Sequence, residues 1–169
     1  MQAELKLIGQ YGLRNKHELW RQETMLSTFR GTARSLIGKT PEERKKMEEE
    51  LLTRLKRLGI LPETAVLDDV LDMTIEDILE RRLQTIVLRK GLAKTIQQSR
   101  QLITHGHITM AGHRVKIPGH MVTKPEEGQI DYTAQSSLAN PSHPVRQTIV
   151  AAPQPQGSRE KVRGEREDF

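Results

Sequence analysis

The sequence predicts an α+β protein, in which an N-terminal helical domain precedes a helix-turn-helix pair packed on a small β-sheet. Three observations predict this fold. Apolar residues recur at helical spacing as far as residue 106, each run follows a helix-start signal, and the period then changes to that of strands. The 169 residues, 35% of them hydrophobic, suffice for two small units. We place these at residues 1–78 and 79–134, followed by a polar, largely disordered tail at residues 135–169.

Two long helices are expected in the N-terminal domain. Asn15 and Glu18 have the spacing of a capping box, and apolar residues then recur at helical intervals until Gly38. Pro41 stands at a first helical position, where its missing N–H costs nothing, and a leucine stripe follows as far as Gly59. The helices should therefore end at the two glycines.

The helix-turn-helix pair comes next. Thr74 begins a helix that is expected to run without interruption to Gly91, and Thr95 caps a second helix that ends at Gly106. A connection this short between two helices is typical of the helix-turn-helix motif.

The strands follow the second helix of the pair. They are expected at residues 108–110, 113–115, 121–122 and 129–132. The first two flank a two-residue turn, Ala111-Gly112, and another turn is expected at residues 125–128. Beyond Tyr132 the chain is rich in Ser, Pro and Asn and has few apolar residues, which predicts the disordered tail.

Positive charge is concentrated in one segment. Residues 81–124 contain nine Lys or Arg and no Asp or Glu, although the chain has 22 acidic residues. Such a concentration indicates a polyanionic partner. The segment has no Phe, Tyr or Trp to stack on bases, so recognition is expected to depend on phosphate, 2′-hydroxyl groups and shape. This favours structured RNA, with duplex DNA left open as the competitor.

The candidate RNA-binding residues are polar and basic side chains expected on the exposed faces of the helix pair, its turn and the hairpin. They are Arg81, Arg82, Gln84, Lys90, Lys94, Thr95, Arg100, Gln101, His105, His107 and Arg114. Five basic residues of the N-terminal domain are additional candidates: Arg14, Lys16, Arg21, Arg30 and Arg34. The helix that begins at Thr95 also offers unpaired N–H groups to a phosphate. Replacing Arg82 and Arg100 with Ala is expected to lower RNA affinity and to leave the thermal midpoint nearly unchanged.

No metal site, cofactor or catalytic residue is expected. The chain has no cysteine, and His105 and His107 have no carboxylate in their segment. The acidic pairs at residues 68–69 and 76–77 are interpreted as helix caps, not as acid-base groups. The absence of a glycine-rich cofactor loop speaks against an enzyme and a small-molecule substrate.

Trp20 lies at helical spacing beside apolar residues and is expected to anchor the core or a helix contact. No apolar run reaches the length of a membrane span, and the first residues lack the apolar stretch of a secretory signal. We therefore expect a cytoplasmic protein without a membrane partner.

Several motifs resemble a known family. The RNA-binding domain named after small-subunit ribosomal protein four is similar in GLAKT at residues 91–95, SRQLITHGHI at residues 99–108, and then Gly112, Val115 and Pro118. Upstream, YGLRNKHELWR at residues 11–21 resembles the start of the helical domain of that ribosomal protein in its archaeal and eukaryotic form. Three residues depart from the family pattern, which usually has Ala, Asn and Ser where Ser99, Ala111 and Gly119 stand. The basic N-terminal extension usual in the family is not expected here.

The resemblance implies a primary RNA-binding protein of the small ribosomal subunit. Such a protein nucleates subunit assembly, contributes to translational accuracy, and contacts neighbouring ribosomal proteins as well as small-subunit ribosomal RNA. It also implies that RNA is bound by Arg81, Arg82, Thr95, Arg100, Gln101, His105, Gly106 and His107. The alternative is a ribosome-associated quality-control or heat-shock protein that uses the same RNA-binding module.

Overall fold

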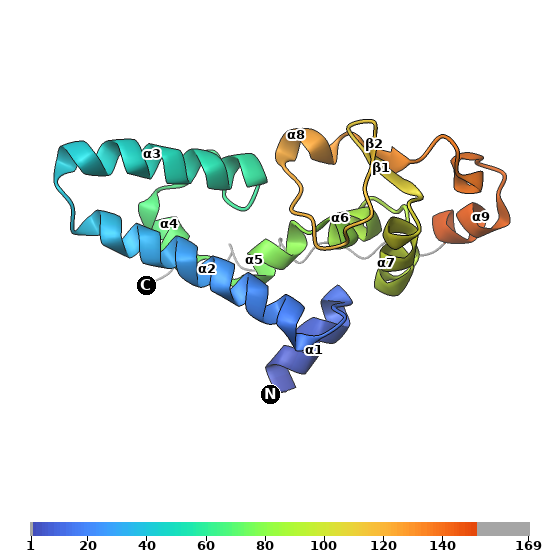
Figure 1. Cartoon of the computed structure of the whole chain (residues 1–169), viewed down its shortest axis with the longest axis horizontal. Coiled ribbons are helices and arrows are strands. Elements are labelled where there is room, and N and C mark those ends of the chain that lie inside the picture. Colours follow the sequence, from blue (N-terminus) through green and yellow to red (C-terminus); the bar gives the residue numbers. More distant parts are fainter. Residues whose placement is uncertain (1, 152–169) are drawn as a thin grey trace, which may run out of the picture.

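The N-terminal half of the protein is helical. The computed structural model describes residues 2–151. Its first five helices are α1 (Gln2–Tyr11), α2 (Lys16–Ile37), α3 (Pro41–Leu58), α4 (Leu67–Asp72) and α5 (Ile75–Glu80). Helix α2 is the central element, because α1, α3, α4 and α5 all contact it. Figure 1 shows α2 and α3 as two long rods at one end of the molecule, with α1 projecting below.

Local signals in the sequence set the ends of these helices. The Asn15 side-chain oxygen accepts a hydrogen bond from the Glu18 backbone N–H at 3.1 Å, which confirms the predicted cap of α2. Helix α3 ends as predicted at Gly59, whose φ of 72° lies in the left-handed region that favours glycine. Helices α1 and α4 are additions that the sequence analysis did not anticipate.

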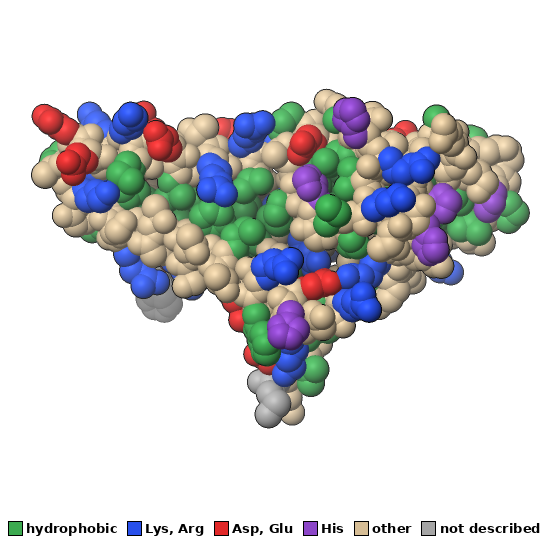
Figure 2. Space-filling model, viewed as in Figure 1, with side chains coloured by type: hydrophobic (Ala, Val, Ile, Leu, Met, Phe, Trp, Pro, Cys, Tyr) green, Lys and Arg blue, Asp and Glu red, His purple; other side chains and the backbone are tan. Residues whose placement is uncertain are grey.

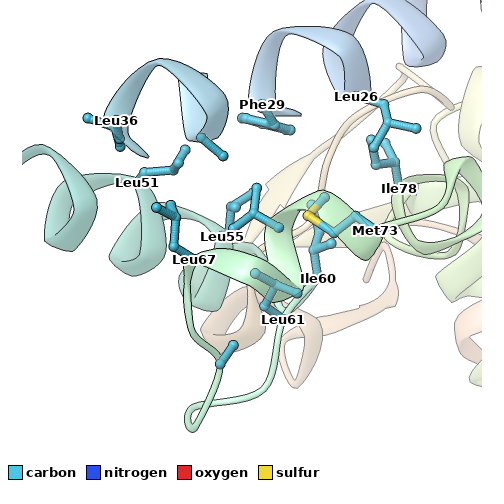
Figure 3. Packing of buried hydrophobic residues seen from close by; sticks show 13 residues of the cluster. Leu26, Phe29, Leu36, Leu51, Leu55, Ile60, Leu61, Leu67, Met73 and Ile78 are labelled. Atoms are coloured by element: carbon cyan, nitrogen blue, oxygen red, sulfur yellow. The ribbon is translucent and has the colours of Figure 1, made fainter. Parts of the chain in front are cut away.

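A hydrophobic core joins α2 and α3 to the segment that follows them. Figure 3 shows Leu36 and Phe29 of α2 on the side of Leu51 and Leu55 of α3, and Leu26 of α2 next to Ile78 of α5. Residues of the α3–α4 connection and of α4 and α5 complete this cluster. The apolar residues recur every three or four positions along α2, so one face of the helix is buried and the opposite face stays in water.

The sequence predicts one helix from Thr74 to Gly91, but the structure divides this stretch into α5 and α6 (Leu83–Arg89). The break occurs because the backbone of Arg81 and Arg82 pairs with a distant segment. The Val122 N–H donates to the Arg81 carbonyl at 3.0 Å, and the Leu83 N–H donates to the His120 carbonyl at 2.8 Å. The strand expected at residues 121–122 is reduced to this single bridge. Carbonyl and amide groups that pair across the chain cannot also continue a helix.

The C-terminal half contains the helix pair and the sheet. After α6 come α7 (Ile96–Thr104), β1 (Ile108–Met110), β2 (His113–Arg114), α8 (Lys124–Glu127) and β3 (Ile130–Tyr132). The strands are antiparallel in the order β2-β1-β3, with Met110 opposite both His113 and Ile130. The turn expected at residues 125–128 is mostly the short helix α8. A second hydrophobic cluster lies between this sheet and the α6–α7 pair.

The segment beyond residue 135 is better ordered than the sequence predicts. It forms a 3-10 turn, η1 (Ser137–Ala139), and a helix, α9 (Pro144–Val150). Leu138 and Ile149 are buried, and the Arg146 guanidinium lies 5.0 Å from the centre of the Tyr132 ring. Leu138, which belongs to the second hydrophobic cluster, and Arg146 thus hold the segment against the sheet. The rest of the predicted tail, residues 152–169, lies outside the described residues.

The hairpin turn carries a strained residue. Ala111 has a φ of 50°, and Gly112 next to it has a φ of 79°. A left-handed conformation costs Ala about 1 kcal/mol, whereas Asn adopts it readily in two-residue hairpin turns. Ala111→Asn is therefore expected to raise the free energy of unfolding by about 0.5–1 kcal/mol, measured by urea denaturation. Ala134→Asn is the matched control, since Ala134 is exposed and is not a positive-φ residue. Equal effects at both positions would contradict the prediction.

Candidate nucleic-acid interface

Three of the candidate RNA-binding residues lie inside the protein. Arg81, Arg82 and Gln84 are 8%, 2% and 0% exposed. Arg81 binds the Glu127 carboxylate at 2.8 Å and the Val122 carbonyl. Their burial removes them from the surface that can meet RNA, and we correct the sequence interpretation accordingly. The sequence carries a signal for the burial of Arg82. Ile78, Leu79 and Ile86 lie three or four positions away from it, which is the spacing of one apolar helix face.

Arg82 and Arg100 share one carboxylate. Both guanidinium groups bind Glu18 at the start of α2, Arg82 at 2.8 Å through Nη2 and Arg100 through both Nη atoms. We call these three residues the Glu18 clamp. Burial raises the pKa of Glu18, but the hydrogen bonds and charges of Arg100 and Arg82 outweigh burial and lower it to about 2. The clamp joins the helical half of the chain to the helix pair.

Two backbone oxygens extend the Glu18 clamp. The Gln84 side-chain amide donates to the Gly12 carbonyl at 3.1 Å and to the Ile96 carbonyl at 3.0 Å. The Gly12 carbonyl also accepts a hydrogen bond from Arg100 at 3.2 Å. Gln84 is therefore a structural residue that ties α6 to both the α1–α2 connection and the start of α7.

The other candidates of the helix pair are placed on the surface. Lys94, Thr95, Gln101 and His105 are exposed along α7 and at its start. The Thr95 hydroxyl caps α7 by accepting from the Gln98 N–H at 3.1 Å, as predicted. Lys90 is also exposed, but its ammonium group binds the carbonyls of Glu127 and Ile130 at 2.8 and 3.0 Å. It therefore contributes to holding the sheet against α6.

Gly106 brings basic side chains over the end of α7. Its φ is 76°, and an added Cβ would lie 2.9 Å from Cδ of Arg114 and 3.2 Å from Cε of Lys116. Both of these residues are exposed, and Lys116 was missed in the sequence analysis. The His107 ring stacks near His105 with ring centroids 6.4 Å apart, and its Nδ1 lies 2.8 Å from the Ser136 hydroxyl. Because Gly106 has no side chain, the Arg114 and Lys116 side chains can lie close together over the end of α7.

We define the α7 face as the exposed residues of this region. They are Lys94, Thr95, Gln101, Thr104, His105, Arg114 and Lys116. Figure 2 shows Lys, Arg and His side chains over the part of the molecule formed by α7, β1 and β2, whereas acidic side chains gather at the far end over α3. The sign of the surface charge therefore differs between these two parts of the molecule.

The five additional candidates of the N-terminal half differ in whether their side chains are free to contact RNA. Arg14, Arg21 and Arg34 are exposed. Lys16 forms an ion pair with Glu4 at 3.3 Å. Arg30 donates to the Met73 carbonyl at 2.5 Å and is partly buried, so it connects α2 to the α4–α5 junction.

Trp20 is not a core residue. It is 45% exposed on the outer face of α2, and the expectation that it anchors the core or a helix contact is wrong. Its position follows from the helical repeat, because the neighbouring Leu19 and Leu26 already occupy the buried face.

The second residue of each acidic pair caps a helix, as predicted. Asp69 accepts a hydrogen bond from the Val66 N–H and Asp77 from the Thr74 N–H, each at 2.8 Å. Between residues 2 and 151 no three His, Asp or Glu side chains gather as a metal ion would require. In the same range, no helix combines the length and apolar character of a membrane crossing.

Known proteins are similar to this chain over nearly all of its length. Residues 81–127 match the S4 domain family. The small ribosomal subunit protein uS4 of Hyperthermus butylicus is 57% identical over 136 residues, which cover 80% of this chain and 77% of that protein. The protein of the same name from Thermoplasma acidophilum is 46% identical over 165 residues, covering 96% and 83%. That of Nanoarchaeum equitans is 50% identical over 145 residues, covering 85% and 81%. The similarity includes the helical half as well as the S4 domain, and the chain belongs to the uS4 family of small ribosomal subunit proteins.

Proposed function

We propose that the protein is a structural constituent of the small ribosomal subunit that binds small-subunit ribosomal RNA through the α7 face. Membership in the uS4 family is the observation that carries this proposal, and it favours a structural role over catalysis. The protein would then act in the cytoplasm, on the ribosome. The same membership supports contact with neighbouring ribosomal proteins.

The chemistry of the α7 face suits folded RNA. Lys94, Arg114 and Lys116 can neutralise phosphates, and Thr95, Gln101 and Thr104 can donate to phosphate or 2′-hydroxyl oxygens. His105 donates to phosphate when neutral and adds charge when protonated. Residues 81–124 contain no Phe, Tyr or Trp to stack on bases. These properties favour recognition of an RNA helix or junction by its backbone.

We further propose a division of labour between the two halves of the chain. Residues 1–78 and 79–134 would act as two units that hold opposite sides of one folded RNA element. The Glu18 clamp supports this, because it fixes the start of α2 against α7. A protein that holds an RNA junction in one arrangement can nucleate assembly and influence translational accuracy.

The double variant Arg114→Ala, Lys116→Ala tests the proposed RNA contact. Affinity for small-subunit ribosomal RNA should fall steeply with salt, and the log-log slope should lose about 0.7–0.9 for each phosphate contact removed. Filter binding of the whole protein at several salt concentrations measures this slope. Because both side chains are exposed, the thermal midpoint should stay nearly constant.

The matched control is Lys45→Ala, Lys46→Ala on α3. These two lysines are exposed but lie among acidic residues of the α3 segment. Their loss should leave the salt slope almost unchanged. A slope that falls equally in both double variants would mean that attraction is diffuse, and would contradict an RNA site on the α7 face.

A further inference from the structure

The environment of Trp20 points to a ligand. Trp20 is the only tryptophan of the chain, and its indole stands in water on α2 while the opposite face of the helix is buried. His17, one turn earlier, lies with its ring centroid 5.0 Å from that of the indole and its plane at 88° to it. A large aromatic side chain gains most when its faces are covered, so this pair is suited to receive another flat ring.

An open depression lies beside Trp20. It has a volume of about 420 Å³ and is also lined by Glu23, Thr24, Ser27 and Thr28. The two threonine hydroxyls donate to the helix backbone at 2.8 and 2.9 Å. The side chain of Glu23 is exposed and makes no hydrogen bond or ion pair within residues 2–151. Its carboxylate is therefore an available acceptor next to the indole.

The charge around the depression fits a nucleic acid. Arg14, just before α2, and Arg21, near the start of α2, are both exposed. Glu18, the nearest acidic residue toward the start of the helix, is directed into the Glu18 clamp and is neutralised there by Arg82 and Arg100. Glu23 is thus the carboxylate that lines the depression, and the exposed Arg14 and Arg21 supply positive charge for phosphates near this end of the helix.

We propose that Trp20 and Glu23 receive one unpaired guanine of the small-subunit RNA. The base stacks on the indole, which is the usual way in which proteins hold an unstacked base. Guanine presents two adjacent donors, N1–H and N2–H, which match the two oxygens of a carboxylate. The other bases present acceptors beside their donors on that edge. The inference deepens the proposed function and rests on it, because it assumes that the protein binds this RNA.

Chemical probing of the RNA tests the proposal. Kethoxal modifies guanine at N1 and N2 only where these atoms are free, and hydroxyl radicals report contacts along the backbone. The full-length protein, bound to small-subunit RNA transcribed in vitro, should protect one unpaired guanine from kethoxal. Trp20→Ala and Glu23→Gln should each restore its reactivity about tenfold while the backbone footprint persists. Ile37→Ala, which removes another half-exposed apolar side chain of α2, should leave the guanine protected.

The outcomes separate the two proposals. If no backbone footprint forms with the unaltered protein, the proposed function fails. If the footprint forms but no guanine depends on both Trp20 and Glu23, or if a different base does, the guanine site is wrong. If Trp20 fluorescence is unchanged by RNA but altered in assembled subunits, the depression belongs to a protein neighbour and the proposal is overturned. Glu23→Gln keeps the test valid should Trp20→Ala unfold, because Glu23 is exposed.

Discussion

Replacing Glu18 with Ala is expected to lower the free energy of unfolding by about 3 kcal/mol, near the lower end for breaking a buried ion pair. The cost arises because Arg82 is 2% exposed and would keep its charge without a partner. Glu18 itself is 23% exposed, which limits the loss. For a chain of this size the thermal midpoint should fall by roughly 6–12 °C, measured by circular dichroism.

The pH dependence gives an independent check on the Glu18 clamp. The pKa of Glu18 is lowered in the folded protein from its ordinary value of 4.5 to about 2. A lowered carboxyl pKa stabilises the folded state above the unfolded pKa, and the contribution disappears as the pH falls through the folded pKa. The difference in stability between the unaltered protein and Glu18→Gln should therefore be constant above about pH 5 and should shrink between pH 4.5 and pH 2.

Glu63→Ala is the control for Glu18→Ala. Glu63 also pairs with a basic residue, Lys124 at 2.8 Å, but its side chain is 74% exposed. Water screens such a pair, so its removal should leave the thermal midpoint unchanged. If the two variants had the same thermal midpoint, the Glu18 clamp would not be important for stability.

The double variant Arg82→Ala, Arg100→Ala has a different expected outcome once the structure is considered. Charge alone suggests lower RNA affinity at an unchanged thermal midpoint. Because both residues bind Glu18 and Arg82 is buried, we now expect the thermal midpoint to fall as well. A loss of RNA binding in that variant would therefore report altered folding and cannot assign an RNA contact. The α7 face variants avoid this ambiguity.

Features set by neighbouring residues could be predicted from the sequence. The caps at Asn15 and Thr95 each involve a side chain and an N–H three residues away, and both bonds are present. Gly59 and Gly106 follow the ends of their helices with positive φ, a conformation that glycine adopts at no steric cost. The hairpin at residues 108–114 follows the same rule, since a short turn fixes its register.

Features set by distant residues could not be predicted in this way. The charge of residues 81–124 is a property of composition, whereas the direction of each side chain depends on the partner that the fold brings near. Arg82 is separated from Glu18 by 64 residues, and the break between α5 and α6 needs the carbonyl of His120. The exposure of Trp20 likewise follows from which face of α2 the later helices cover. The sequence therefore indicates which kinds of side chain bind RNA more reliably than which individual residues are exposed to do so.

Gly12→Ala is expected to be as damaging as Glu18→Ala. The φ of Gly12 is 59°, and an added Cβ would lie 2.7 Å from Nε2 of Gln84 and 2.8 and 2.9 Å from two carbons of Ile96. Gln84 is fully buried and Ile96 nearly so, which leaves neither free to move aside. Backbone strain and overpacking together should lower the free energy of unfolding by about 3 kcal/mol, measured by urea denaturation.

Gly31→Ala is the matched control for Gly12→Ala, and the double variant with Glu18→Ala tests the mechanism. No atom lies within 4 Å of a Cβ added at Gly31 in the middle of α2, so Ala should stabilise the helix there by about 1 kcal/mol. Gly12 and Glu18 both contact Arg100, and perturbing either one already disturbs that guanidinium. Gly12→Ala, Glu18→Ala should therefore lose clearly less stability than the sum of the single losses. Strict additivity would mean that the two positions act separately and that the Glu18 clamp does not extend to the α1–α2 connection.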